Sequence, residues 1–137
     1  MAKKRKNPKQ GTATIYRGIK YRSKWEVYVA KLLLYSDTRF LYEPRRFFLT
    51  ASLSYLPDFY IPDRQVYLEV KGVLTPRDIL LLKIFSESEK VIYLGKKQLS
   101  YIHGKAASAL SKLDVVNYVP TKSEIRKFQD VLQYLQK

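Results

Sequence analysis

The sequence predicts an α/β fold: an αβββαβ core with a mixed sheet flanked by helices, followed by a C-terminal helix–strand–helix extension. Apolar residues recur with a helical period over residues 23–37 and then gather into three short, nearly continuous runs typical of strands. A second amphipathic helix leads into a fourth apolar run. A strand–helix–strand unit of this kind places its two strands parallel through a right-handed crossover, which makes the sheet mixed.

Helix-start signals justify the two helices of the core. Ser23 is placed to cap the first helix, along which Trp25, Val29 and Leu32 form an apolar stripe. The second helix is predicted over residues 75–88. Its start signals are Thr75 as N-cap, Pro76 in the first helical position and Asp78 at the third position of a near capping box.

The strands follow from the apolar runs and the turns between them. The first three runs cover residues 45–51, 55–61 and 65–71, and the fourth covers residues 90–95. Short turns at residues 52–54 and 62–65 favour an antiparallel meander of the first three.

The C-terminal third predicts a helix over residues 96–113, a short strand over residues 114–120 and a helix over residues 121–137. The last helix begins with a Thr121-x-x-Glu124 capping box. Its apolar stripe consists of Ile125, Phe128, Leu132 and Leu135, so it is expected to pack on the domain.

Composition indicates one basic domain. A chain of 137 residues suits a single domain, which we assign to residues 21–137, after a basic N-terminal arm over residues 1–20 that we expect to be flexible. The formal net charge of +14 favours a polyanionic partner, and nucleic acid more than a membrane because no basic amphipathic helix stands out. The arm is read as a phosphate-binding segment, a solubility tail or a nuclear localisation patch.

Several classes are excluded or disfavoured. The chain has no cysteine, so it has neither disulfides nor a thiolate zinc site, and its apolar runs are too short to span a membrane. No signal-peptide pattern is found, and we expect a cytoplasmic protein with no membrane partner.

Charged residues in the strand candidates predict a metal site. Asp58 and Glu69 lie on neighbouring strands, where two close carboxylates repel unless a divalent cation joins them. Mg²⁺, with Mn²⁺ as a substitute, suits such oxygen ligands, and the backbone carbonyl of Val70 is a further candidate ligand. Lys71 shares the face of Glu69 because side chains alternate along a strand, so its ammonium can orient water or neutralise charge on a phosphate.

Glu26 is the fourth candidate catalytic and metal-site residue. It shares a helix face with Val29, Ala30 and Leu33, which directs it toward the sheet, where general-base work or contact with metal-bound water is open to it. The competing interpretation makes Asp58 a turn residue and Glu69 with Lys71 an exposed cross-strand pair.

These residues resemble the restriction-endonuclease-like PD-(D/E)XK superfamily of metal-dependent nucleases, with Asp58, Glu69 and Lys71 on its signature and Glu26 in its helical position. The segments YRSKWE, LYEP, LPDFYIP and YLEVKG resemble phage endonuclease I type Holliday junction resolvases, and also TnsA-like nuclease domains. The resemblance spans about residues 21 to 94.

The resemblance implies hydrolysis of DNA phosphodiesters to a 5′-phosphate and a 3′-hydroxyl, by nicking or by resolving branched or duplex DNA, in a bacterial cytoplasm if the chain is phage-encoded. The alternatives are a non-catalytic nucleic-acid binding module and an RNA-directed nuclease of the same fold. Two sites are needed to cut two strands, so a homodimer is expected, held through the apolar side of the last helix or an exchanged strand.

Other residues are secondary candidates. DNA contacts are expected from Lys3, Lys4, Arg5, Lys6, Arg22, Lys24, Arg77 and Lys83. Tyr21 and Tyr55 are candidates for stacking on a base. Glu43 is read as an ion-pair partner of Arg45 or Arg46, or as an extra acid. His103, the only histidine, is expected at a surface helix position without a role.

Overall fold

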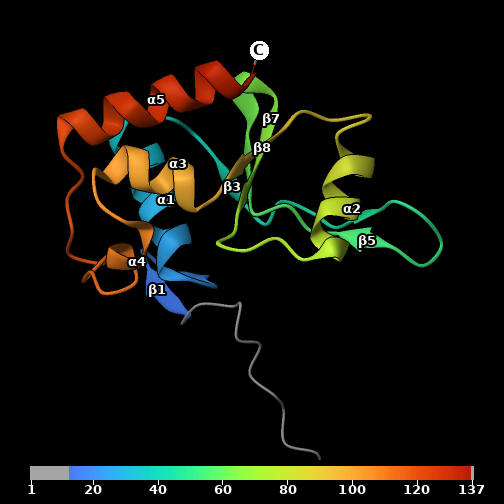
Figure 1. Ribbon diagram of the computed structural model, residues 1–137, viewed down its shortest axis with the longest axis horizontal. Helices are drawn as coiled ribbons and strands as arrows, with labels where there is room; N and C mark the ends of the chain where they lie inside the picture. The colour runs from blue at the N-terminus through green and yellow to red at the C-terminus, as the bar shows by residue number, and fades with distance from the viewer. Residues whose placement is uncertain (1–12, 137) are drawn as a thin grey trace, which may run out of the picture.

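The computed structural model describes residues 13–136 as a mixed α/β fold, which confirms the predicted fold class (Figure 1). Its main sheet has the strand order β3 (Leu41–Tyr42), β6 (Phe59–Ile61), β7 (Val66–Val70) and β8 (Val91–Leu94). β3, β6 and β7 pair antiparallel, whereas β8 is parallel to β7, as the predicted crossover requires. No helix in this part of the chain is long and apolar enough to cross a membrane.

Both core helices begin where their caps predict. α1 (Lys24–Tyr35) starts after Ser23, whose hydroxyl accepts a hydrogen bond from the backbone N–H of Glu26. α2 (Pro76–Phe85) starts after Thr75 with a complete capping box to Asp78. Two local signals therefore fix the helix starts that later frame the site.

The two faces of β7 belong to two different cores. Val66, Leu68 and Val70 pack with α1 and the C-terminal helices in the larger core. Tyr67, on the opposite face, packs with Leu81 and Phe85 of α2 in a smaller core, which also contains the hairpin of β4 (Phe47–Phe48) and β5 (Ser54–Tyr55). Figure 1 shows α2 and β5 on one side of β7 and β8, and α1, α3 and α5 on the other. Glu69, which alternates with Val70, therefore belongs to the α2 face.

The meander differs from its prediction. Residues 45–51 form only the two-residue β4, which pairs with β5 in a separate hairpin, and β3 takes the place beside β6. The run over residues 55–61 is broken at Pro57 and Asp58, because proline has no N–H to give to a ladder. A short 3-10 helix, η1 (Pro62–Arg64), joins β6 to β7.

The N-terminal segment contains a hairpin of β1 (Thr14–Tyr16) and β2 (Ile19–Tyr21), which turns at Gly18 with a φ of +80°. The domain boundary expected at residue 20 falls inside this hairpin. Residues 1–12 lie outside the described part of the chain, and with them the four DNA-binding candidates Lys3, Lys4, Arg5 and Lys6.

The C-terminal third departs most from its prediction. The helix expected over residues 96–113 is divided into α3 (Lys96–His103) and α4 (Ala107–Leu110), because Gly104 adopts a left-handed φ of +78° at the end of α3. The strand predicted over residues 114–120 is wrong, since these described residues form turns. The buried Lys31 ammonium donates to the carbonyls of Val116 and Tyr118, which provides the backbone there with a partner other than a strand.

The last helix, α5 (Lys122–Gln136), has the predicted capping box: Thr121 and Glu124 exchange side-chain to backbone hydrogen bonds of 2.9 and 3.1 Å. Its Phe128 and Leu132 are buried in the chain's own larger core. The expected packing of this helix on the domain is therefore confirmed for these two side chains, and the dimer contact stays a prediction.

Glu124 joins α5 to α1 and α3. Its carboxylate accepts hydrogen bonds from the hydroxyls of Tyr28 and Tyr118, and the Nδ1 atom of His103 lies 2.9 Å from it. The expected surface position of His103 is therefore wrong, because only 7% of its side chain is exposed. The hydrogen bonds hold the pKa of Glu124 at about 2, against the opposing effect of burial.

Candidate active site

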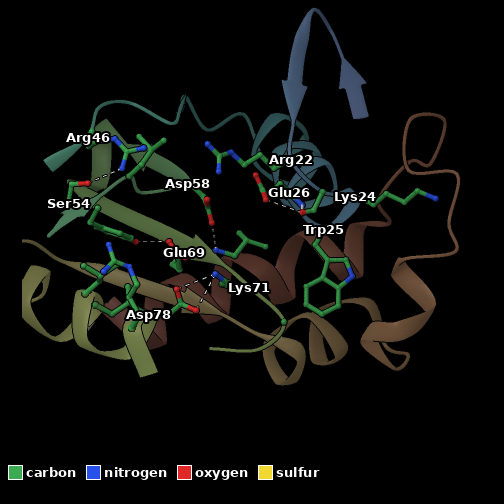
Figure 2. Close-up of a pocket in the computed structure, with 18 of the residues that line it drawn as sticks. Arg22, Lys24, Trp25, Glu26, Arg46, Ser54, Asp58, Glu69, Lys71 and Asp78 are labelled. Atoms are coloured by element: carbon green, nitrogen blue, oxygen red, sulfur yellow. Dashed lines mark hydrogen bonds and ion pairs between the residues drawn. The ribbon is translucent and has the colours of Figure 1, made fainter. Parts of the chain in front are cut away.

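One pocket of about 560 Å³ brings the four predicted catalytic residues together. Glu26, Asp58, Glu69 and Lys71 all line it (Figure 2). Its walls come from the start of α1, the start of α2 and the end of β7. With Asp78, the pocket contains four of the chain's 12 acidic residues, in a protein of net charge +14. The lining of the pocket is therefore richer in acidic residues than the chain as a whole.

Asp58 lies in the bend that precedes β6, and its Oδ2 atom accepts a hydrogen bond of 2.7 Å from the backbone N–H of Val70. Burial raises the pKa of Asp58 well above its usual range, and the negative charges of Glu69 and Glu26 raise it further. The Val70 hydrogen bond opposes this shift. Asp58 thus lies at a turn, as the competing interpretation expected, but its negative charge and that of Glu69 still repel each other across the pocket.

Glu69 lies on β7 and is only 8% exposed, so the reading of Glu69 and Lys71 as an exposed cross-strand pair is wrong. The hydroxyl of Tyr55 donates to its Oε1 atom at 2.6 Å. Burial raises the pKa of Glu69 to about 7, although the Tyr55 hydrogen bond and the charge of Lys71 act in the opposite direction. A carboxyl group with this pKa exchanges its proton near neutral pH.

Glu26 is the third residue of α1 and is 5% exposed. The hydroxyls of Ser23 and Tyr42 donate to its two carboxylate oxygens, so both are held in place. Burial raises the pKa of Glu26 as well, and the nearby Glu43 adds to the shift. The helix-face argument placed Glu26 correctly, but it did not reveal the two hydroxyl partners.

Lys71 follows directly after the last residue of β7 rather than lying inside the strand. Its Nζ atom is 3.1 Å from Asp78, and its carbonyl accepts a hydrogen bond of 2.6 Å from the hydroxyl of Tyr93. Asp78 was predicted only as a capping residue. Its second role could have been inferred, because the short loop from β7 to α2 must bring the start of α2 next to Lys71.

Gly72 allows a close approach between this loop and α1. A Cβ atom at Gly72 would lie 3.0 Å from the indole of Trp25, a distance at which the ring would have to move. Trp25 lines the pocket, and its Nε1 atom is buried without a hydrogen-bond partner in the described chain.

The four DNA-contact candidates among the described residues divide into two groups. Arg22, Lys24 and Arg77 line the pocket, whereas Lys83 of α2 is exposed and does not line it. Arg22 pairs with Glu43 at 2.7 Å, so the expected pairing of Glu43 with Arg45 or Arg46 is wrong. Arg46 instead lines the pocket, and its bond to Ser54 is drawn in Figure 2.

The two tyrosines proposed for base stacking are buried. Tyr21 is 1% exposed and packs against Tyr42 with ring centroids 4.5 Å apart, and Tyr55 is 5% exposed and bonded to Glu69. Neither ring is open to a base, so this expectation is wrong.

The carboxylates of the pocket are potential ligands for Mg²⁺. Among residues 13–136, no group of three or more histidine, aspartate or glutamate side chains is placed to hold a metal ion together. Magnesium, however, is commonly bound by one or two carboxylates together with waters and substrate phosphate. Asp58 and Glu69 meet this smaller requirement, because each has an oxygen that its hydrogen bond to Val70 or Tyr55 does not use, and their mutual repulsion favours a cation.

No model of a known protein family matches the chain, and neither a curated protein nor a solved structure is found to be similar to it. The resemblance to PD-(D/E)XK nucleases therefore stays a prediction from the motif residues of the sequence.

Proposed function

We propose that this protein is a magnesium-dependent DNA endonuclease that hydrolyses phosphodiester bonds in the pocket of Glu26, Asp58, Glu69 and Lys71. One observation carries the proposal: three carboxyl groups, each with a pKa raised chiefly by burial, share a pocket with a lysine in a strongly basic protein. A structural role alone does not account for this arrangement, because buried like charges cost stability.

The metal would be held by Asp58, Glu69 and the carbonyl of Val70. Glu26, which lines the same pocket, is the further candidate to contact the metal or its water. When bound, the metal ion would polarise the phosphate and lower the pKa of a coordinated water. Burial is the largest cause of the raised pKa of Asp58 and Glu69, and neighbouring negative charges, which such an ion would offset, add to it.

The other roles fall to side chains that are already oriented. Glu26 is fixed by two hydroxyls and is the candidate to accept a proton from the attacking water, directly or through a second water. Lys71 is held at the pocket wall by Asp78 and supplies positive charge for the phosphate as negative charge develops on it. The water oxygen forms the new bond to phosphorus, the bond to the 3′ oxygen breaks, and that oxygen takes up a proton.

The test is digestion of linear duplex DNA, a four-way junction, single-stranded DNA and RNA with Mg²⁺, with Mn²⁺ or with a chelator. The wild type should cut DNA only with metal, and the variants Asp58→Asn, Glu69→Gln and Lys71→Met should cut at least about 100-fold more slowly. Glu26→Gln should also impair cutting. Glu87→Gln, at an exposed glutamate outside the pocket, is the matched control.

DNA binding separates the alternatives. Pocket variants that bind DNA but do not cut it support the proposal, whereas wild-type rates in any of the three would contradict the assignment. Binding without cleavage by the wild type under all conditions would favour a non-catalytic module, and cleavage of RNA alone would favour the RNA-directed alternative.

Resolution of a junction would require two such sites, and we expect a homodimer for this activity. Light scattering at micromolar concentration gives the solution mass, and the junction and its matching linear duplex give the preference. A monomer that leaves single nicks in both substrates would reject the resolvase reading and retain a nicking endonuclease.

A further inference from the structure

The pocket has more cationic side chains than the single lysine assigned to the cleaved phosphate. Five cationic side chains line it: Arg22, Lys24, Arg46, Lys71 and Arg77. Its volume of about 560 Å³ lies in the ~300–1,000 Å³ range of pockets that hold drug-sized ligands, well above the size of one phosphate group. The question is which of these cations are available to a ligand.

Two of the five are paired with an acid: Lys71 with Asp78 and Arg22 with Glu43. The ammonium of Lys24 donates to the carbonyl of Ser111 at 3.2 Å and lies on the side of the pocket away from Arg46 (Figure 2). Within residues 13–136, neither Arg46 nor Arg77 forms an ion pair, and both are exposed at the pocket rim.

Arg46 and Arg77 come from different elements that are fixed to each other. Arg46 directly precedes β4, and Arg77 is the second residue of α2. The smaller core locks these elements together, because the Phe85 ring of α2 lies 4.9 Å from both Phe47 and Tyr55 of the hairpin. Arg46 donates to the hydroxyl of Ser54 at 3.1 Å, which orients its guanidinium and leaves other N–H groups for a ligand.

Helix stability does not explain the position of Arg77. A cation in the first turn of a helix is unfavourable, because that end carries the positive end of the helix dipole. The same turn holds Asp78, which is engaged by Thr75 and Lys71. An anion bound at the rim would turn this unfavourable position of Arg77 into a favourable one.

We propose that Arg46 and Arg77 form a subsite for the phosphate next to the one that is cleaved, on the side of the pocket built by α2 and the β4–β5 hairpin. This inference rests on the proposed function. Arginine suits the role because its planar guanidinium can bind phosphate oxygens with two parallel hydrogen bonds. Figure 2 shows Arg46 on one side of Asp58 and Glu69, with Arg22 and Lys24 on the other, so the subsite lies to one side of the catalytic carboxylates.

The first test is a substrate series for the metal-activated wild type, in which one phosphate at a time around the cleavage position is replaced by a neutral methylphosphonate. Replacement at one neighbouring position should lower kcat/KM by about tenfold, and Arg46→Ala and Arg77→Ala should each lower it by about tenfold on the natural substrate. In the double variant the same methylphosphonate should have no further effect. Equal sensitivity of the wild type and the double variant to that methylphosphonate would overturn the subsite.

A matched control exists on the hairpin. Arg45→Ala removes the neighbouring arginine, which stacks on Phe47 at 4.1 Å and does not line the pocket. This variant should retain the wild-type response to each methylphosphonate. A control variant that matches the double variant would show general charge attraction in place of a subsite.

A second measurement separates this inference from the proposed activity. Binding of a fluorescent DNA oligonucleotide without metal should weaken in the Arg46→Ala/Arg77→Ala variant, and the slope of log affinity against log salt should fall by about one unit, as expected for one lost phosphate contact. If the wild type never cleaves DNA but this slope changes, the proposed enzyme function fails and the phosphate contacts stand. If cleavage occurs and neither the slope nor the methylphosphonate pattern changes, only the subsite fails.

Discussion

Glu69→Gln should stabilise the metal-free protein at the expense of its proposed activity. The native carboxyl group is buried, and its pKa is raised from 4.5 to about 7. Its charged form is therefore disfavoured in the folded state. Glutamine has nearly the same shape but no charge, and its amide oxygen can still accept the hydrogen bond from Tyr55.

The magnitude follows from the shift. A difference of between two and three pKa units corresponds to about 3 kcal/mol above pH 7, at about 1.4 kcal/mol per unit. This shift already includes the effect of the hydrogen bond from Tyr55, which favours the carboxylate and lowers the pKa. The gain of about 3 kcal/mol corresponds to about 10 °C in Tm for a chain of 137 residues.

The sign of the pH dependence provides the test. The folded state keeps the Glu69 proton between pH 4.5 and about 7, so wild-type stability falls as pH rises through this window. Thermal unfolding of wild type and Glu69→Gln without metal should therefore give similar Tm values at pH 5 and a higher Tm for the variant at pH 8. Mg²⁺ should raise the Tm of the wild type at pH 8 more than that of the variant. A variant that is no more stable than wild type at pH 8, or whose advantage is the same at both pH values, would refute the reasoning.

Three further predictions concern other parts of the molecule. Gly72→Ala should displace Trp25, lower the free energy of unfolding by about 1–3 kcal/mol and shift the emission of this single tryptophan. Glu124→Gln should destabilise the protein by about 3 kcal/mol above pH 5, because the pKa of Glu124 is held at about 2 in the fold, and the loss should vanish as pH falls through 2. Deletion of residues 1–10 should weaken binding to all DNA sequences about equally and flatten the salt dependence by about one unit of slope per lost contact.

A different experimental result would contradict each of these three predictions. Unchanged emission and unfolding in Gly72→Ala would mean that the loop has room for a methyl group. A Glu124→Gln penalty that persists at pH 2 would point to packing in place of charge. An unchanged salt slope after the deletion would assign the N-terminal residues to solubility.

Local signals explain what the sequence could predict of the fold. The caps at Ser23, Thr75 and Thr121 each act within three residues, so the starts of α1, α2 and α5 were readable. Strands of two residues, such as β3 and β4, carry too short a pattern to identify their partners, and their pairing depends on distant chain segments. The apolar Val115 and Val116 suggested a strand, but a buried lysine from α1 takes two backbone carbonyls of that segment.

In the candidate site too, the sequence identified the residues of a local pattern and missed those brought in by tertiary packing. Asp58, Glu69 and Lys71 were found because their spacing along two strands is a local pattern, and all three line one pocket. Tyr42 and Tyr55, which donate to the buried acids, and Arg46, which lines the rim, come from segments whose positions depend on tertiary packing. No spacing in the sequence connects these three residues to the motif.

The contacts of Glu124 affect when the pocket can take its shape during synthesis. Tyr28 of α1 and Glu124 are separated by 96 positions, whereas every residue that lines the pocket lies between Arg22 and Ser111. During translation, all the residues that line the pocket are therefore synthesised before Glu124, whose carboxylate accepts the hydrogen bond from Tyr28 of α1. Until that residue emerges, Tyr28 has no carboxylate partner, and the wall that presents Glu26 lacks part of its support. The acidic residues of the pocket are thus synthesised first, and α1, which carries Glu26, gains its hydrogen bond to Glu124 only afterwards.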